Sequence, residues 1–324
     1  MIRVAVIGVG HFGREHARIY ASIPEARLEA LCDIDERART VSERLNVPLV
    51  SDFRELIGKV DAVSLAVPTV EHHRIACDLL GAGIAVLVEK PICRTLEQAG
   101  EMIAVASRTG AVLQVGHLER FNPAVVAAGK IATTPRFFEG HRLSVFTPRS
   151  LDIDVVMDLM IHDIDVVLSL VGGEVAEIRA AGVAVITPHT DIANARIEFK
   201  NGCVANLTAS RISAERIRKL RFFQPAEYVS IDYGAQEAAM ISVKPGGPGG
   251  APQFTSQLLP VQREEPLAAE IAAFLHSVAS GTTPVVSGAE GRNALALALS
   301  VNEQIRINFE KNRPVTGQDR LKPG

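Results

Sequence analysis

Two groups of polar side chains in this sequence have types and positions that suit proton-transfer chemistry. Asp158 and His162 stand four residues apart in a predicted helix, so both side chains share one face. Histidine has the ordinary pKa nearest neutrality, and the two residues could therefore form an acid–base pair. Lys90 follows an apolar strand in Glu89-Lys90-Pro91, at the edge where parallel sheets bind ligands. Simpler interpretations stay open: a core histidine satisfied by Asp158, and a solvated lysine.

A glycine-rich turn, Gly8-Val9-Gly10-His11-Phe12-Gly13, stands between an apolar strand and a predicted helix. In G-x-G-x-x-G, the first glycine permits the tight turn and the second lets the backbone approach a pyrophosphate. The third lets the helix pack on the sheet. The helix N-terminus then offers free N–H groups to the phosphates. Asp33 comes 20 residues after Gly13 and can accept both ribose hydroxyls of an adenosine, which predicts a dinucleotide site rather than a structural turn.

Asp33 also bears on which dinucleotide binds. Its carboxylate would repel a 2′-phosphate, which favours NAD over NADP. Arg37 and Arg39 follow closely, and either guanidinium could pair with that phosphate, so NADP stays open as the less favoured cofactor.

The elements that position these residues alternate between strands and helices over the first 120 residues. Such alternation indicates crossover units and a parallel sheet, so the fold class is α/β, doubly wound. The predicted strands are Ile2–Gly8, Arg27–Asp33, Val47–Ser51, Asp61–Val67, Ala85–Glu89 and Ala111–Val115. The predicted helices are Phe12–Ser22, Asp35–Leu45, Glu71–Ala82 and Thr95–Arg108, the last opened by a capping box.

After Arg120 strands follow one another directly, which indicates an α+β domain on a largely antiparallel, open sheet. We therefore predict two domains, residues 1–120 and 121–324. Asn201-Gly202 predicts a hairpin turn, and residues 244–250 form a Gly/Pro-rich loop. The strands are Glu139–Phe146, Val175–Ile186, Ala193–Phe199, Val204–Ser210, Ile217–Phe223 and Tyr228–Asp232. The helices are about Val155–Val171, Pro266–Ser280 and Ala289–Glu310.

Composition excludes several classes of protein. The 324 residues carry 34 Lys+Arg against 37 Asp+Glu, a net charge of -3, which disfavours a nucleic-acid-binding protein. No uncharged apolar run approaches the roughly 18–20 residues of a membrane helix, and no signal-peptide pattern opens the chain. The four cysteines are scattered, which suits a reducing cytoplasm and no structural zinc. We expect a cytoplasmic protein with no bound metal.

Six motifs in order resemble the Gfo/Idh/MocA oxidoreductase family, and the resemblance covers essentially the whole chain. They are Gly8–Gly13, Cys32-Asp33-Ile34-Asp35, Val67-Pro68 with His72, Glu89-Lys90-Pro91, Gly116–Pro123, and Asp158-x-x-x-His162-x-x-Asp165. The final helices, with Glu265-Pro266-Leu267, Glu270 and Phe274, also look like that family. The resemblance implies a Rossmann domain, a second α+β domain and hydride transfer between a sugar hydroxyl and NAD.

The resemblance also implies roles for individual residues. Lys90, Asp158 and His162 would be catalytic: His162 would take the hydroxyl proton, Lys90 would stabilise the developing alkoxide, and Asp158 would position the sugar and His162. Cofactor contacts would come from the glycine turn, from Asp33, and from four residues on the nicotinamide side, Pro68, His72, Glu89 and Arg120. Where the family often has glycines around this Asp and His, Met157 and Leu159 predict a bulkier pocket wall.

The resemblance also implies a substrate. The segments GHLERFNPAV and DVVMDLMIHDIDVVL resemble the branch that oxidises the 3-hydroxyl of UDP-N-acetylglucosamine. A diphosphate needs nearby cations, and Arg142 and Arg149 precede the predicted helix that bears His162. More cations, Arg211, Arg216, Arg218 and Lys219, mark a strand junction, although a solvated sheet edge explains them equally well. Alternatives are a free polyol such as inositol, a non-catalytic NAD(H) sensor, and an enzyme that recycles its cofactor.

We expect the protein to associate with itself. A sheet face rich in Val, Ile and Phe is rarely left to water, so an exposed face on the second domain predicts a homodimer or homotetramer.

Overall fold

The computed structural model describes residues 1–147, 153–246 and 250–311. The chain forms two compact units. Unit 1 comprises residues 1–131, 235–238 and 258–296, and unit 2 comprises the described residues within 132–234, 239–257 and 297–324. The first segment of unit 1 thus extends past the predicted boundary at residue 120, and two later segments return to it. Contacts between residues far apart in the chain decide this division, so no local pattern could predict it.

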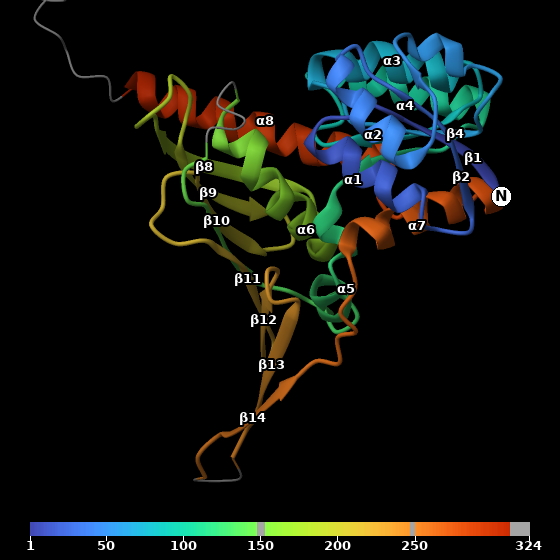
Figure 1. Cartoon of the computed structure of the whole chain (residues 1–324). Helices are drawn as coiled ribbons and strands as arrows, with labels where there is room; N and C mark the ends of the chain where they lie inside the picture. The colour runs from blue at the N-terminus through green and yellow to red at the C-terminus, as the bar shows by residue number, and fades with distance from the viewer. Residues whose placement is uncertain (148–152, 247–249, 312–324) are drawn as a thin grey trace, which may run out of the picture. The chain divides into compact units, whose positions relative to one another are not determined.

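Unit 1, whose first segment runs from blue to green in Figure 1, is built on a six-stranded parallel sheet with the order β3-β2-β1-β4-β5-β6. The predicted doubly wound sheet is confirmed, and the strand order reverses between β1 and β4, where such sheets bind ligands. The strands are β1 (Ile2–Ile7), β2 (Ala26–Cys32), β3 (Leu49–Val50), β4 (Ala62–Leu65), β5 (Ala85–Glu89) and β6 (Leu113–Gly116). The helices are α1 (His11–Tyr20), α2 (Arg39–Leu45), α3 (Thr69–Gly81), α4 (Leu96–Thr109), α5 (Pro123–Gly129) and α7 (Pro266–Ser280).

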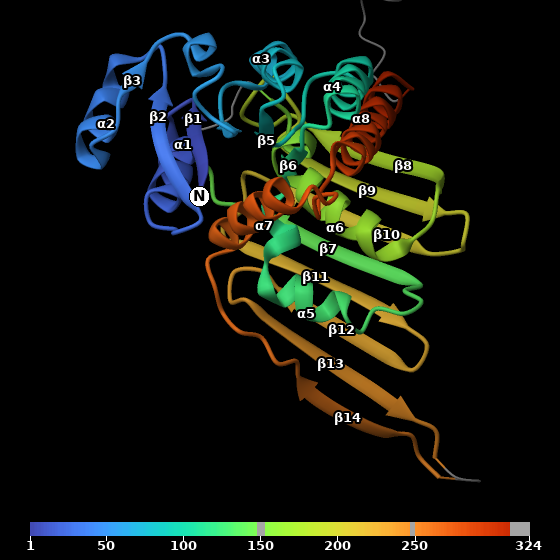
Figure 2. The same cartoon turned by 90° about the vertical axis from the view of Figure 1, so that its right-hand side faces the viewer.

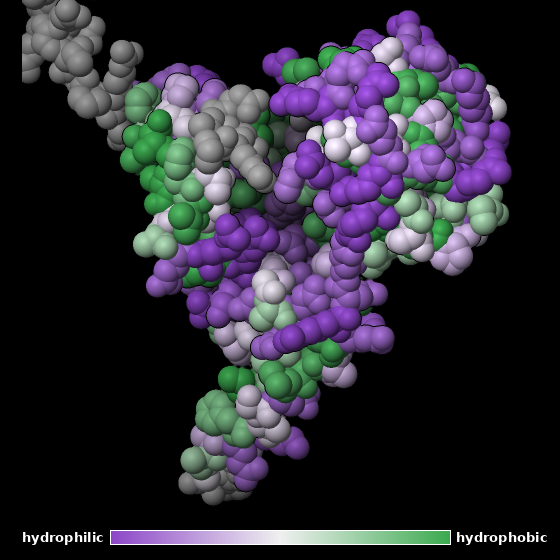
Figure 3. Space-filling view, in the orientation of Figure 1, coloured by the Kyte–Doolittle hydropathy of each residue, from purple (hydrophilic) through white to green (hydrophobic). Residues whose placement is uncertain are grey.

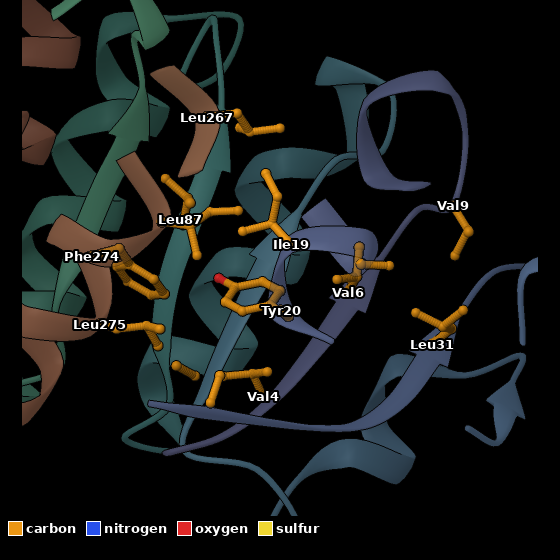
Figure 4. Close-up of a cluster of buried hydrophobic side chains, with 14 of the residues drawn as sticks. Val4, Val6, Val9, Ile19, Tyr20, Leu31, Leu87, Leu267, Phe274 and Leu275 are labelled. Carbon is orange, nitrogen blue, oxygen red and sulfur yellow. The ribbon is translucent and has the colours of Figure 1, made fainter. Parts of the chain in front are cut away.

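The core of unit 1 explains why α7 folds with it. Val4 of β1 and Leu87 of β5 are fully buried, and Tyr20 of α1 packs in the same cluster. Phe274 and Leu275 of α7 contribute to that cluster too (Figure 4). Burying one large apolar side chain stabilises the fold by about 1.5–3 kcal/mol. The helix that we predicted for the second domain therefore packs in the first unit.

Unit 2 is built on an eight-stranded sheet with the order β14-β13-β12-β11-β7-β10-β9-β8 (Figure 2). Neighbours β7 and β10 run parallel, whereas β8–β9, β9–β10, β7–β11 and β11–β12 run antiparallel, so the predicted largely antiparallel sheet is confirmed. The strands are β7 (Phe137–Leu143), β8 (Val175–Val183), β9 (Ile192–Phe199), β10 (Val204–Ser210), β11 (Ile217–Gln224), β12 (Glu227–Asp232), β13 (Glu237–Lys244) and β14 (Gln253–Leu258). Gly202, with φ +81°, turns the chain between β9 and β10.

One face of this sheet is buried and apolar. Phe138 of β7, Leu207 of β10 and Phe222 of β11 are at most 1% exposed, and α6 (Ile161–Val171) packs against β7 and β10. Strand residues alternate between faces, so these side chains lie on the covered side and their neighbours along each strand face the other way.

The opposite face carries polar cross-strand pairs. Arg221 Nε lies 3.2 Å from Glu139 Oε2, and Asn194 Nδ2 donates to Thr208 Oγ1 over 2.9 Å. The exposed face of the central strands therefore combines polar pairs with apolar side chains such as Phe223, which is 39% exposed, and self-association stays a prediction.

Two strands and one helix were missed, namely β13, β14 and α5. Every residue of β14 is exposed, so the strand has no apolar alternation to recognise. Figure 3 shows polar and apolar surface intermingled over the end of the sheet that β13 and β14 form. Part of the predicted Gly/Pro-rich loop, residues 247–249, lies outside the described residues. The last helix, α8 (Gly288–Lys311), begins in unit 1 and ends in unit 2.

Candidate active site

The glycine turn between β1 and α1 has the geometry that a pyrophosphate requires. Gly8 has φ +86°, and a Cβ there would lie 2.5 Å from the Ala66 carbonyl oxygen. A Cβ on Gly13 would lie 1.7 Å from the Gly8 carbonyl oxygen, so a larger residue would push α1 away from the turn. A Cβ on Gly10 would meet no atom within 4 Å, which leaves that backbone open to a ligand.

The N-terminus of α1 meets this turn directly. Gly10 is its N-cap residue and supplies no side-chain cap, so the positive end of the helix can accept phosphate. His11 and Phe12 are exposed in the first turn, with ring centroids 5.5 Å apart in an edge-to-face arrangement. Both side chains therefore lie beside the place predicted for the pyrophosphate.

Asp33 ties the end of β2 to the glycine turn. Its Oδ2 accepts the Val9 N–H over 2.6 Å, and its Oδ1 accepts the Asp35 N–H over 2.9 Å. The carboxylate lines a cavity of about 700 Å3 that Gly8 and Pro68 also line. A cavity of that size suits a small organic ligand, which fits the adenosine half of a dinucleotide.

The two arginines that could have attracted a 2′-phosphate both have acidic partners. Arg37 Nε donates to Asp35 Oδ2 over 2.7 Å, and Arg39 Nη2 donates to Glu36 Oε2 over 2.7 Å. A phosphate would have to compete with these carboxylates and with the charge of Asp33. The local charges therefore favour NAD.

His72 of α3 joins two backbone segments. Its side chain is buried, with Nδ1 3.0 Å from the Pro91 carbonyl oxygen and Nε2 2.9 Å from that of Val67. Burial lowers the pKa of His72, outweighing the two carbonyl oxygens. Because both ring nitrogens face backbone oxygens, His72 joins the segments that carry Val67 and Pro91.

Glu89 and Lys90, where β5 ends, are both half-buried. Glu89 Oε1 lies 3.0 Å from His16 Nε2. Burial by itself would raise the pKa of Glu89, but the His16 hydrogen bond, with the charges of Lys90 and His72, lowers it. A carboxylate therefore precedes the lysine. Sequence reasoning missed His16, although a polar residue on the core-facing side of α1 was the available signal.

Arg120 and His117 follow β6, the neighbour of β5. Arg120 Nη2 donates to the Val285 carbonyl oxygen over 3.3 Å and to Glu290 Oε1 over 3.2 Å, which anchors it to residues at and before the start of α8. His117, which we had not singled out, is 1% exposed. Burial, followed by the charges of Lys90 and Arg120, lowers the pKa of His117 to about 3. It is therefore a neutral imidazole near Lys90.

Asp158 and His162 lie on one continuous helix in unit 2, but the helix is irregular. Asp158 belongs to a π-helix, Val156–Met160, and His162 is the second residue of α6. Both side chains are half-buried. The π turn rotates less per residue than an α-helix, so the two residues depart from the ideal i,i+4 relation that we predicted. Such turns are frequent at functional sites.

Asp154 fixes the start of this helix. Its Oδ1 accepts the N–H groups of Val156 and Met157 over 2.9 and 3.0 Å, and Asn302 Nδ2 donates to its Oδ2 over 3.0 Å. The segment Asp154-Val155-Val156, an acid before an apolar run, is a helix-start pattern that we overlooked.

Two of the arginines that we predicted near a substrate diphosphate, Arg142 and Arg211, have partners within the protein. Arg142 is 4% exposed, its Nε and Nη2 donate to the two carboxylate oxygens of Asp163 over 2.8 and 3.0 Å, and it covers the ring of Tyr233. This pairing gives Arg142 a structural role beside His162. Arg211 is likewise buried and donates to the Ile153 carbonyl oxygen over 2.6 Å. Arg149 lies outside the described residues.

The predicted residues therefore form two groups. Unit 1 holds the glycine turn, Asp33, Glu89 and Lys90, and unit 2 holds Asp158 and His162. The first group has the chemistry to bind a dinucleotide beside a lysine. The second has a carboxyl group and an imidazole on successive helical turns, which can position a hydroxyl group and accept its proton.

Comparison with known proteins identifies the family. Residues 2–117 match "Oxidoreductase family, NAD-binding Rossmann fold", and residues 131–223 match the GFO/IDH/MocA C-terminal domain. UDP-N-acetylglucosamine 3-dehydrogenase of Acidithiobacillus ferrooxidans is 39% identical over 312 residues, which cover 96% of this chain and 99% of that relative. The chain belongs to the Gfo/Idh/MocA oxidoreductase family.

Other similarities agree with membership in the Gfo/Idh/MocA family. The scyllo-inositol 2-dehydrogenase (NAD(+)) of Bacillus subtilis is 26% identical over 344 residues, 98% of each chain. The solved structure of the Acidithiobacillus ferrooxidans enzyme superposes with a TM-score of 0.88 at 38% identity, covering 94% of this chain and 98% of that one. Levoglucosan dehydrogenase in complex with NADH and levoglucosan shares the fold, with a TM-score of 0.84 at 20% identity, covering 94% of this chain and 97% of that one.

Membership of the Gfo/Idh/MocA family confirms the predicted oxidoreductase class, the Rossmann domain and NAD as its cofactor. Among the described residues, no helix combines the length and apolar character needed to cross a membrane.

Proposed function

We propose that this protein oxidises the 3-hydroxyl of UDP-N-acetylglucosamine to a ketone and passes the hydride to NAD. The similarity to the Acidithiobacillus ferrooxidans enzyme of that name, 39% identical over 96% of this chain, carries the proposal. The presence of Lys90, Asp158 and His162 supports it, because an NAD(H)-sensing regulator has no need to keep all three.

The proposed reaction divides the work among these side chains. His162 accepts the hydroxyl proton as hydride leaves the carbon that bears it, and Lys90 donates a hydrogen bond to the oxygen as negative charge develops there. Asp158 holds the sugar and orients His162. NAD, held by the glycine turn and Asp33, supplies the hydride acceptor. The products are the 3-keto sugar nucleotide, NADH and one proton.

The diphosphate of the substrate needs cationic partners, and Arg142 and Arg149 stay our predicted ones. For Arg142 the competing partner is Asp163, whose two oxygens already accept from its guanidinium. Bulky Met157 and Leu159 beside the catalytic pair favour a pocket shaped for one sugar over a pocket open to any monosaccharide.

The direct test mixes purified protein, NAD and UDP-N-acetylglucosamine and follows nicotinamide absorbance, with a carbonyl trap or a partner aminotransferase to pull the equilibrium. Inositol and glucose are parallel substrates. NADH that forms only with the nucleotide sugar supports the proposal. NADH formed with inositol instead would make the protein a polyol dehydrogenase.

No NADH with any substrate, despite tight NADH binding, would contradict the proposal. It would favour a sensor or an enzyme that recycles its cofactor. Cofactor that copurifies with the protein and turns over without net NADH would identify the recycling enzyme.

We also propose a cytoplasmic location and self-association as a homodimer or homotetramer. The four cysteines form no disulfide with one another, as expected in a reducing compartment. The face of the unit 2 sheet opposite α6 offers a broad surface of paired polar side chains, which a second copy of the chain could cover.

A further inference from the structure

A cluster of titratable side chains includes Glu89, the residue directly before Lys90. His16 of α1, Glu89 of β5 and Glu270 of α7 bring one nitrogen and two carboxylate oxygens within 4.8 Å of one another. His16 and Glu270 are fully buried. The proposed reaction uses neither His16 nor Glu270.

The hydrogen bond between His16 and Glu89 has a defined direction. Its Nε2 lies 3.0 Å from Glu89 Oε1 and its Nδ1 lies 2.9 Å from Ser64 Oγ, which in turn lies 2.9 Å from the Tyr20 hydroxyl. A carboxylate can only accept, so Nε2 carries the proton that points at Glu89. Nδ1 meets the Ser64 hydroxyl, which can donate or accept, and Ser64 in turn meets Tyr20. Burial raises the pKa of Tyr20, so its hydroxyl stays a donor.

This arrangement distinguishes the cluster from a metal centre. A metal ion would need an unprotonated nitrogen of His16, but Ser64 and Glu89 occupy both nitrogens. Glu270 brings a second carboxyl group to the same imidazole, and two neighbouring buried carboxyl groups resist ionising together. Hydrogen bonds therefore hold the cluster together, with His16 at its centre.

Glu89 depends on His16 for its charge. Burial acting by itself would raise the pKa of Glu89, and the His16 hydrogen bond is the largest effect that opposes it. Glu89 immediately precedes Lys90, so the bond that holds the carboxylate also holds the backbone from which the lysine projects. We propose that His16 is a positioning residue: it clamps Glu89 as an oriented carboxylate and thereby places Lys90 for the reaction. This rests on the proposed role of Lys90.

Two substitutions separate the two hydrogen bonds of His16. In His16→Asn the shorter side chain can still reach Ser64 but no longer extends to Glu89. In His16→Gln the longer side chain can still donate to Glu89. His73→Asn is the matched control, because His73 Nε2 also meets a carboxylate, that of Glu101 over 2.7 Å, at a separate position on α3.

For His16→Asn we expect kcat to fall about 10- to 100-fold with KM for NAD changed much less, since a small displacement of a reacting group costs that much. Its kcat should also fall more steeply than that of wild type as pH is lowered from about 8 to 6, because burial then raises the pKa of an unclamped Glu89 and favours its protonated form. His16→Gln should recover most of kcat and the pH profile of wild type. His73→Asn should match wild type.

Equal losses in His16→Asn and His16→Gln, or an unchanged pH profile in His16→Asn, would overturn the proposal and leave His16 a packing residue. A divalent ion that copurifies stoichiometrically with wild type and is lost from His16→Asn would also overturn it, in favour of a metal site.

Amide hydrogen exchange keeps this test independent of the substrate. Exchange of the peptide spanning residues 86–96 should be faster in His16→Asn than in His16→Gln or wild type, whether or not UDP-N-acetylglucosamine is oxidised. Failure of the proposed function would abolish turnover in all variants but leave this difference intact. Identical exchange in all variants would refute the positioning role itself.

Discussion

Lys90 is the residue on which the proposed chemistry depends most directly. Lys90→Met keeps the length of the side chain but removes the positive charge, so NADH should still bind while kcat falls. Loss of one preorganised donor to a developing oxyanion lowers kcat by about 10²–10³-fold. Turnover by nicotinamide absorbance and NADH affinity by fluorescence measure the two effects. Lys59→Met, at an exposed lysine of unit 1, is the control, and near-normal kcat in Lys90→Met would remove Lys90 from the mechanism.

We expect the charge of Asp33 to favour NAD, with its free ribose hydroxyls, over NADP. Asp33 also orders the glycine turn. Asp33→Ala removes the acceptor for the N–H groups of Val9 and Asp35, and each hydrogen bond to a charged group contributes about 1.5–3 kcal/mol. We expect the Kd for NAD to rise at least tenfold and the Kd for NADP to change far less. Asp33→Asn, which keeps one acceptor, should lie between. Equal losses for both cofactors would show that Asp33 does not read the ribose.

Arg142 offers a test between a structural ion pair and a phosphate ligand. Breaking a buried pair leaves an uncompensated charge and costs about 3–5 kcal/mol. Arg142→Met should therefore lower the free energy of unfolding in urea by about that amount, and Arg142→Met/Asp163→Leu should recover most of it. If the single variant is as stable as wild type but has a greatly raised KM for the nucleotide sugar, the guanidinium binds phosphate instead.

At the scale of elements, the ends of β-strands and the start of one helix hold the proposed catalytic side chains. Asp33 and Lys90 directly follow β2 and β5, where parallel strands present their carboxyl ends. In unit 2 the π-helix between Asp154 and α6 sets the direction in which Asp158 points. The cap at Asp154 is therefore expected to affect the reaction as well as stability.

Asp154→Ala should destabilise the protein by about 1 kcal/mol, the usual cost of an N-cap. It should also lower kcat, because the turn that carries Asp158 loses its anchor. Thr95→Ala is the matched control: Thr95 caps α4 by accepting the Gln98 N–H, so its loss should lower stability similarly without changing kcat. Urea unfolding and turnover of both variants measure the comparison. Equal kcat in the two variants would limit Asp154 to stability.

At the scale of the whole molecule, the open sheet of unit 2 decides how copies could associate. Its exposed face carries polar pairs beside apolar side chains such as Phe223, so an interface there would combine apolar contacts with hydrogen bonds and ion pairs such as Arg221–Glu139. We expect light scattering to give a dimeric or tetrameric mass, and Arg221→Glu to lower it by placing like charges together. A monomeric mass for wild type would end the hypothesis of self-association.

The sequence by itself determined the parts of this protein that depend on local periodicity and on spacing. The alternation of strands and helices predicted the parallel sheet, and the spacing of Gly8, Gly10 and Gly13 before Asp33 predicted a dinucleotide site. Both depend on backbone geometry within a few residues or on one crossover unit, which a linear pattern records. The NAD-binding class followed from these residues and from the family resemblance.

Only the tertiary structure decided which residues meet across long separations. The packing of Phe274 in the buried cluster that contains Tyr20 places α7 in unit 1, and the pairing of Arg142 with Asp163 gives a predicted phosphate ligand a structural partner. The clamp of His16 on Glu89 joins residues 73 positions apart. Such contacts depend on how elements pack and on the cost of leaving a buried charge unpaired. A local sequence pattern predicts neither.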